Sequence, residues 1–429
     1  MVGVNFYPER VGIGVYTHDM CRFFVQAGHL VSVVTGFPFY PELRLAPGYA
    51  RRWFVSEHID GITVHRCFVR VPRRWSVSGR ISHELSFALS ALPRLLTQRP
   101  DVLVVVSPPF APAVVAALVA RARNTPLAVH VQDLQPDAAA RLGMLRNAVA
   151  LRALYGAERY LYRSAALVSA LDQSMRARIV EKGVPEEKVA VFPNWVDVPL
   201  AASADRGDEF RAEHGLRNRF LVIYSGSMGV KQGLELILDV AAIATEEPNV
   251  MFVLIGDGAA RWQLEADTRA RRLANVMFLP LQPLERFRAV LAASDISLIP
   301  QRSAVRDLVV PSKVLRILAA GSPIVAAAHA DSGLAQLLRQ SRAGVLVPHD
   351  DAAALWRAIR GLKADPEQRL AMGERGRAYA AQHFDRQVIL KDYLQRLGWI
   401  ARGAGRTRTV QDSPSGRSPA NRRSTEHSC

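Results

Sequence analysis

The sequence predicts an α/β protein with two doubly wound parallel sheets in tandem. Three observations carry this prediction. Short apolar runs rich in Val, Ile and Leu alternate with longer amphipathic segments, a pattern typical of βα units. The alternation stops at a polar stretch, residues 200–208, and then starts again. The length of 429 residues is also enough for two domains.

In the first half, the apolar runs predict strands and the segments between them predict helices. A short run at residues 2–6 predicts an initial strand. The longer strand candidates span residues 30–35, 62–66, 102–106, 127–131, 166–170 and 189–192. The helix candidates span residues 16–27, 83–97, 112–123, 146–163 and 172–182. Because one helix separates most successive strands, these strands are expected to be parallel.

The second half repeats the same rhythm. Strands are predicted at residues 220–225, 251–255, 276–279, 296–300, 324–327 and 344–347. Helices are predicted at residues 233–244, 261–273, 284–292, 313–320, 334–340, 352–365 and 366–382. The two Rossmann-like domains are therefore expected at residues 1–198 and 209–385, facing each other across a cleft.

The C-terminal end divides into a helix and a tail. Residues 386–400 predict a helix that is able to cross back over the first domain. Residues 401–429 are dominated by Gly, Ser, Pro, Arg and Thr, so they bury too little apolar area to offset the entropy of ordering. We expect this segment to be a disordered basic tail.

Composition narrows the functional classes. The formal charge of +16 favours anionic partners: a phosphorylated ligand, an anionic membrane surface or nucleic acid. No zinc-finger spacing, aromatic RNP motif or basic zipper supports the nucleic-acid reading. Cys21, Cys67 and Cys429 have neither zinc-type nor CxxC spacing, so neither a metal site nor a disulfide framework is indicated.

The location expected from the sequence is cytoplasmic. The N-terminal residues lack the basic leader and apolar core of a signal peptide. The most apolar stretch, residues 102–120, is interrupted by prolines, whereas a membrane span needs about 20 unbroken apolar residues.

Candidate ligand contacts lie at strand-to-helix turns, because ligands of open α/β sheets bind at the carboxyl ends of the strands. The first turn contains Gly12 and Gly14 and opens a helix. The turn at residues 225–233 carries Lys231, which is placed to meet a phosphate held by backbone N–H groups. It lacks the GxxxxGK[ST] order of a P-loop. As a lone signal, the first turn is equally compatible with an ordinary tight turn. For the second, the alternative is an ordinary strand turn with a surface lysine.

Three further positions complete the candidate set. Gly256 and Gly258 flank Asp257 after a strand, where a ribose or base can lie against the backbone. Ser312 is expected to cap a helix that opens with Lys313, so a phosphate is able to sit on the helix dipole and the lysine charge. His130 and Asp133, at another strand end, are candidates to contact a sugar hydroxyl or a leaving phosphate; a structural histidine is the alternative.

Taken in order, these motifs resemble a known family. The sequence reads Ser-Gly-Ser-Met-Gly-Val-Lys-Gln-Gly from residue 225, then Gly-Asp-Gly, Pro-Ser-Lys, Ala-Ala-Gly and Ser-Pro-Ile-Val. The combination resembles retaining glycosyltransferases of family 4, which have the GT-B fold. Asn-Phe-Tyr-Pro-Glu, Gly-Ile-Gly-x-Tyr-Thr, His-Val-Gln-Asp-Leu-Gln and Phe-Pro-Asn-Trp-Val-Asp resemble its colanic-acid and exopolysaccharide subgroup. The resemblance covers about residues 3–400.

The resemblance implies a transferase that uses a nucleoside-diphosphate sugar and needs neither a metal nor a cofactor. It assigns the catalytic positions to Lys231, His130 and Asp133. It assigns the donor-binding positions to Gly12, Gly14, Gly226, Gly229, Gly256, Gly258, Ser312 and Lys313. In the same turns, Ser227, Asp307, Pro311 and Arg316 are further donor-binding candidates. The implied acceptor is a polyprenyl-diphosphate-linked saccharide at the inner face of the plasma membrane. Residues 51–54 and 70–75, which mix basic and aromatic side chains, are candidates for membrane contact.

Two departures from the family pattern keep alternatives open. The family often has Arg where Ser227 stands, and it has two Glu eight positions apart, at the slots of Leu308 and Arg316. Asp307 is a candidate replacement for one of them, and Arg316 is a candidate phosphate contact. The alternatives are an inactive paralogue, a nucleotide-sugar epimerase or a phosphorylase. An epimerase acts without any acceptor, which distinguishes it from a transferase.

Overall fold

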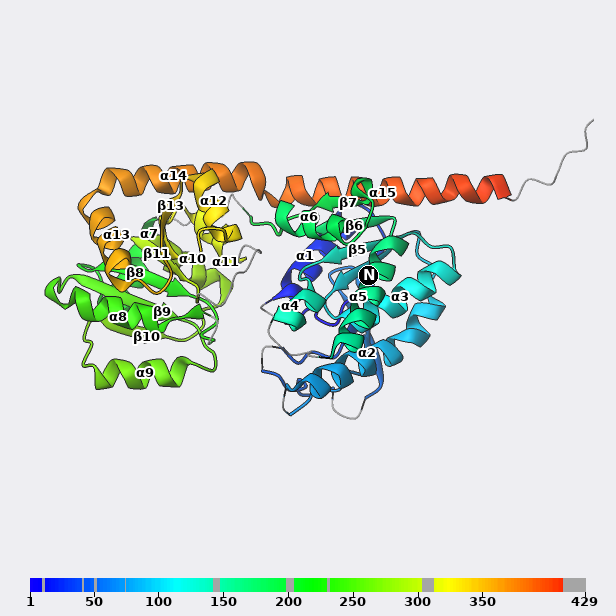
Figure 1. Ribbon diagram of the computed structural model, residues 1–429, viewed down its shortest axis with the longest axis horizontal. Coiled ribbons are helices and arrows are strands. Elements are labelled where there is room, and N and C mark those ends of the chain that lie inside the picture. The colour runs from blue at the N-terminus through cyan, green and yellow to red at the C-terminus, as the bar shows by residue number, and fades with distance from the viewer. Residues whose placement is uncertain are drawn as a thin grey trace, which may run out of the picture.

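The computed structural model describes residues 1–9, 12–40, 42–49, 52–73, 75–141, 147–197, 204–229, 232–302 and 312–411. It contains two sheets with helices on both faces, one in each half of the chain (Figure 1). The α/β class is therefore confirmed. The predicted junction between the domains overlaps residues 198–203, which lie outside the described residues.

The first sheet is joined at its centre by the N-terminal segment. Its strands, in chain order, are β1 (Ser32–Gly36), β2 (Phe54–Ile59), β3 (Ile62–Cys67), β4 (Leu103–Ser107), β5 (Leu127–Val131), β6 (Leu167–Ala170) and β7 (Val189–Val191). They form the orders β1-β3-β2 and β4-β5-β6-β7, and Val2 pairs in parallel with Val34 on one side and with Val105 on the other. Only β2 runs antiparallel to its neighbour. The predicted initial strand at residues 2–6 is reduced to isolated bridges at Val2, whose side chain is 1% exposed.

Helices cover both faces of this sheet. They are α1 (Ile13–Gln26), α2 (Val77–Thr97), α3 (Phe110–Ala122), α4 (Gln135–Arg141), α5 (Ala148–Ser164) and α6 (Gln173–Glu181). α2 packs on α3 and α3 packs on α5. Helix α1 comes after the central N-terminal segment in the chain, so its N-terminus is expected at the carboxyl edge of the sheet.

The second sheet is parallel throughout. Its strands are β8 (Phe220–Ser225), β9 (Val250–Ile255), β10 (Val276–Leu279), β11 (Ile296–Pro300), β12 (Ile324–Ala327) and β13 (Gly344–Val347), in the order β10-β9-β8-β11-β12-β13. The helices are α7 (Ala204–Glu213), α8 (Glu235–Ile243), α9 (Arg261–Ala270), α10 (Leu284–Ala293), α11 (Lys313–Ala320), α12 (Gly333–Ser341), α13 (Ala352–Ala364) and α14 (Pro366–His383). The strand order reverses between β8 and β11, and a ligand is expected at such a switch point.

The last helix, α15 (Arg386–Gln411), crosses back onto the first half (Figure 1). Arg386 donates from Nε and Nη2 to the two carboxylate oxygens of Asp19 on α1, both at 2.8 Å. Trp195 donates to the same carboxylate at 2.6 Å. Tyr393 is buried and stacks on Phe192 at 3.9 Å between ring centroids. The helix continues past residue 400, into the segment that composition alone predicts to be disordered; residues 412–429 lie outside the described residues.

Candidate functional site

Two glycine-containing turns lie side by side at the carboxyl edge of the second sheet. One follows β8 and includes Gly226 and Met228, and the other follows β9 and includes Asp257. The Gly226 N–H donates to the Ile255 carbonyl at 2.9 Å, and the Met228 N–H donates to the Asp257 carbonyl at 2.8 Å. Backbone hydrogen bonds therefore hold the two turns together next to the switch point.

Close packing of these turns explains two of the predicted glycines. Gly256 has φ +149°, and a Cβ there would lie 1.9 Å from the Gly226 carbonyl oxygen. Gly258 has φ +153°, and its Cβ would lie 2.5 Å from the Met228 carbonyl oxygen. Both contacts are far shorter than a van der Waals contact, so no residue with a side chain fits without a shift of the backbone. Turn packing alone is thus sufficient to require glycine at both positions.

Lys313 brings a positive charge to the same place from α11. Its Nζ lies 4.1 Å from the centroid of the Tyr224 ring, over the ring face. A Cβ on Gly226 would lie 3.6 Å from this Nζ. Burial lowers the pKa of the Lys313 ammonium to about 7, and among the described residues no carboxylate pairs with it. The α11 N-terminus, Lys313 and the β8 turn therefore form a cationic corner suited to an anion.

Ser312 differs in part from its prediction. It precedes α11, but its backbone is already helical and its side chain makes no capping hydrogen bond. Its side chain instead lies close to the phenol of Tyr16, which is on α1 of the first half. Burial raises the pKa of Tyr16, while Arg316, one turn further along α11, lies close enough to lower it. Tyr16 is therefore the point where α1 contacts the cationic corner.

Tyr16 is a site residue that the sequence did not single out. Two signals were available: its place in the first turn of α1, directly behind the predicted glycines, and its place in the motif Gly-Ile-Gly-x-Tyr-Thr. Gly12 precedes α1 with φ +74°, and the buried Gly14 leaves room for the Phe6 backbone, since a Cβ would lie 3.2 Å from the Phe6 nitrogen. The first turn of α1, which follows Gly12 and contains Gly14, therefore lies near the start of α11, and a contact of these glycines with a donor stays a prediction.

The structure argues against the predicted role of His130. Its side chain is 1% exposed, inside β5, and both ring nitrogens have partners: Ser169 Oγ at 3.0 Å and Gln132 Nε2 at 2.6 Å. Burial lowers its pKa to about 3, so the ring is neutral at physiological pH. The residue is one position short of the strand end and is enclosed by protein side chains. Asp133, two positions beyond the strand, is exposed.

The burial of His130 predicts an acid-sensitive contribution to stability. The His130 imidazole takes up a proton at pKa 6.5 in the unfolded state but only near 3 in the folded state. The free energy of unfolding therefore decreases as the pH falls from 6.5 to about 3. The slope from this one group is at most about 1.4 kcal/mol per pH unit. His130→Ala is expected to cost about 2–3 kcal/mol at neutral pH and to make the acid loss shallower in urea unfolding. An unchanged acid slope would contradict this assignment.

Lys231, Asp307 and Pro311 lie outside the described residues. Of the remaining donor candidates, Gly226, Ser227 and Gly229 lie in the β8 turn, and Ser312, Lys313 and Arg316 lie at the start of α11. The predicted donor candidates of the second half therefore converge on one corner of the sheet.

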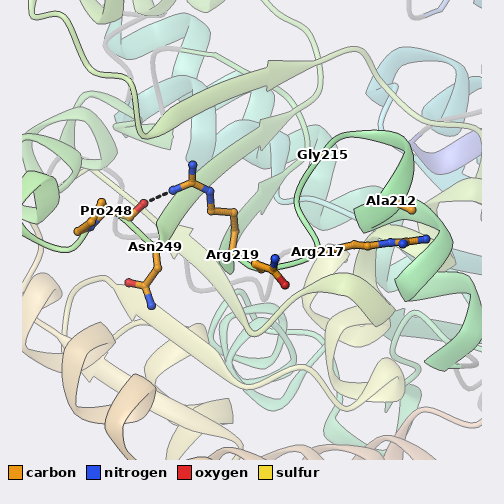
Figure 2. Close-up of a pocket in the computed structure, with 7 residues that line it drawn as sticks. Ala212, Gly215, Arg217, Arg219, Pro248 and Asn249 are labelled. Carbon is orange, nitrogen blue, oxygen red and sulfur yellow. Dashed lines mark hydrogen bonds between the residues drawn. The ribbon is translucent and has the colours of Figure 1, made fainter.

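Two hollows lie near this region, and the first of them reaches the start of α11. A cavity of about 410 Å³ lies between the halves and is lined by residues of both, among them Asn194, Ser312 and Gln336. A shallower hollow of about 770 Å³ is lined by Arg217, Arg219 and Asn249 (Figure 2). The latter residues directly precede β8 and β9, so this hollow lies at the amino-terminal edge of the sheet, opposite the cationic corner.

Comparison with known proteins identifies the family. Residues 11–195 match the family described as glycosyl transferase 4-like domain, and residues 207–379 match glycosyl transferases group 1. The chain is 32% identical over 406 residues to WcaI of Escherichia coli K12, described as a colanic acid biosynthesis glycosyl transferase. The alignment covers 92% of this chain and 98% of WcaI. The chain belongs to glycosyltransferase family 4. It is a glycosyltransferase, as the motifs predicted.

Solved structures confirm the GT-B fold of this glycosyltransferase. HepE of Anabaena, solved with UDP-glucose, matches with a TM-score of 0.65 at 18% identity, covering 95% of this chain and 98% of HepE. Sucrose-phosphate synthase of Thermosynechococcus elongatus matches with a TM-score of 0.73 at 18% identity, covering 94% and 98%. Within the described residues of the glycosyltransferase, no helix has the length and continuous apolar character of a membrane span.

Proposed function

We propose that this glycosyltransferase moves a sugar from a UDP-sugar to a lipid-linked saccharide acceptor. The observation that carries the donor half of the proposal is the cationic corner, where Lys313 lies over Tyr224 beside the β8 turn without a carboxylate partner among the described residues. A diphosphate would supply the missing charge. The choice of UDP is supported by HepE, whose structure contains UDP-glucose.

In the proposed reaction, the bond between the sugar anomeric carbon and the β-phosphate oxygen breaks, and a bond from the acceptor oxygen to that carbon forms on the same face. The proton of the acceptor hydroxyl passes to the departing phosphate oxygen, and configuration is retained. Lys313, Arg316 and the α11 N-terminus stabilise the negative charge that develops on the diphosphate. Tyr16 positions Ser312 from the opposite half, which favours approach of the two halves and exclusion of water.

The acceptor is proposed from the relationship to WcaI and from the charge of +16. The two segments predicted to contact a membrane differ in the structure. Trp53 is 66% exposed and Phe54 is 43% exposed, so they fit that role. Trp75 instead packs on Phe39 and His83, with ring centroids 6.2 and 5.1 Å away, so it is occupied inside the first half.

A thermal-shift titration tests the donor class. We expect UDP to raise the melting temperature more than GDP, ADP or NAD, since a ligand that binds only the native state stabilises it by about 2.7 kcal/mol at a hundredfold excess over Kd. Each nucleotide is measured with and without magnesium. A response to NAD alone would contradict the proposal. No response to any nucleotide would favour the inactive paralogue, because the family carboxylates are absent at the slots of Leu308 and Arg316.

A further inference from the structure

Helix α2 exposes an apolar stripe on the surface of the first half. Val77, Ile81, Leu85 and Leu89 follow one another at four-residue spacing, so they lie on one face of the helix. They are 38%, 52%, 49% and 69% exposed, and Leu96, further along the helix, is 45% exposed. A surface helix ordinarily turns its apolar stripe inward and presents charge outward. This helix also has an inner apolar face, through Phe87, Ala91 and Leu95, so the outer stripe serves another contact.

The neighbouring helices extend the apolar surface. α2 packs on α3, and α3 packs on α5. Leu118 on α3 is 52% exposed and Val149 at the start of α5 is 72% exposed. α2 and α3 lie on the outer side of the first half, away from the second sheet and its helices (Figure 1). The surface therefore remains accessible when a donor is bound at the cationic corner.

Helices α2, α3 and α5 carry an excess of positive charge. Their sequences contain six arginines and two glutamates. Glu84 accepts the N–H groups of Phe110 and Ala111 at 3.1 and 3.0 Å, so it caps α3. Glu158 is fully buried and accepts a hydrogen bond from Lys182 at 2.6 Å. Both carboxylates are thus engaged within the protein, and the outward charge of this surface is positive.

We propose that the outer face of α2, with Leu118 and Val149 beside it, is a docking surface for a bilayer that contains anionic phospholipid. The apolar stripe would enter the boundary between headgroups and acyl chains, and the exposed arginines, including Arg80, Arg121 and Arg152, would meet anionic headgroups. A second copy of the chain fits this face less well, because a symmetric contact would bring two arginine-rich surfaces together. The inference deepens the proposed lipid-linked acceptor by assigning a surface that holds the enzyme at the lipid.

Co-sedimentation with vesicles tests the proposal on the full chain. The wild type is expected to bind vesicles of phosphatidylcholine mixed with phosphatidylglycerol and to bind pure phosphatidylcholine far less. The double variant Leu85→Gln with Leu89→Gln is expected to lower the partition coefficient roughly tenfold or more. The double variant Leu281→Gln with Leu370→Gln makes the same chemical change at exposed leucines of the second half, 51% and 61% exposed, and is expected to bind as the wild type does.

A charge-reversal pair tests the electrostatic part. Arg80→Glu with Arg121→Glu is expected to abolish the preference for anionic vesicles, whereas Arg357→Glu with Arg360→Glu, on exposed positions of α13, is expected to keep it. The proposal would be overturned if the wild type did not bind the vesicles. It would also be overturned if the leucine variant and the Arg80→Glu, Arg121→Glu variant both bound vesicles as the wild type does. A wild-type dimer, seen by light scattering, that the leucine variant makes monomeric would overturn it as well. The UDP-induced thermal shift of the same variants should stay intact, so loss of vesicle binding is separable from failure of the proposed donor.

Discussion

Replacing Lys313 with Gln is expected to weaken UDP binding about 10–100-fold in calorimetric titration, since a hydrogen bond to a charged group contributes about 1.5–3 kcal/mol. The same variant should leave the ligand-free protein as stable or more stable, because burial already disfavours the charged form of this lysine. Weaker UDP binding together with equal or greater stability of the ligand-free protein would mark Lys313 as a ligand-binding group. A large loss of ligand-free stability together with unchanged UDP affinity would contradict this role.

The pKa of Lys313 makes its contribution dependent on pH. The pKa of Lys313 is about 7 in the free protein, and a bound diphosphate would raise it. Above about pH 7, UDP binding is therefore coupled to the uptake of a proton by Lys313. UDP affinity should therefore fall by up to about tenfold per pH unit from about pH 7 to about pH 9. The Tyr224 phenol beneath the ammonium stays neutral, since burial raises its pKa. Lys313→Arg is the matched control: the guanidinium stays charged, so its affinity profile should be flat over the same range.

The strands were predictable because each buried strand is a short apolar run with polar or glycine residues at both ends. β5, β8 and β10 to β13 lie at the predicted bounds. β2 was not predicted, since its six residues alternate between exposed and partly buried positions and include Glu57. It is held as an edge strand by antiparallel pairing with β3 across the two-residue turn Asp60-Gly61. That Asp-Gly turn is a hairpin signal, which a search for apolar runs alone does not use.

Helix α7 shows why part of the second half was not predicted. Its sequence is polar, and its first five residues belong to the polar stretch 200–208 that separates the two predicted domains. Phe210 is nevertheless 3% exposed, and a Cβ on Gly207 would lie 2.8 Å from the carbonyl carbon of Ala292. The helix therefore depends on one apolar anchor and on close contact of its backbone with α10. A glycine in a polar sequence predicts a turn, and only the partner helix reveals this packing role.

The same limit applies to the site. Position in sequence indicated the glycine turns and the start of α11, because strand-to-helix turns of one sheet meet at one edge. It could not separate His130, inside β5, from a residue just beyond the strand, since a difference of one residue decides burial. It also gave no sign that Tyr16 reaches across to Ser312, because the pairing joins different halves of the chain.

The largest loss of stability is expected at Gly256. Gly256→Ala places a Cβ 1.9 Å from the Gly226 carbonyl oxygen, in a backbone conformation of φ +149° that other residues rarely adopt. The turns after β8 and β9 would have to separate, which breaks the Gly226 hydrogen bond to Ile255 and adds backbone strain. We expect a loss of about 3–5 kcal/mol in denaturant unfolding, together with loss of UDP binding by the remaining folded protein.

Gly361→Ala separates this packing effect from the general effect of replacing glycine. Gly361 lies in α13, and a Cβ there meets no atom within 4 Å. The substitution should stabilise the protein by about 0.5–1 kcal/mol, because alanine loses less conformational entropy in a helix than glycine does. If Gly256→Ala were instead as stable as Gly361→Ala, the two turns would not be packed as described. The glycines of the β9 turn would then be free to serve the nucleotide alone, so this pair of variants decides between a packing role and a purely ligand-binding role for Gly256.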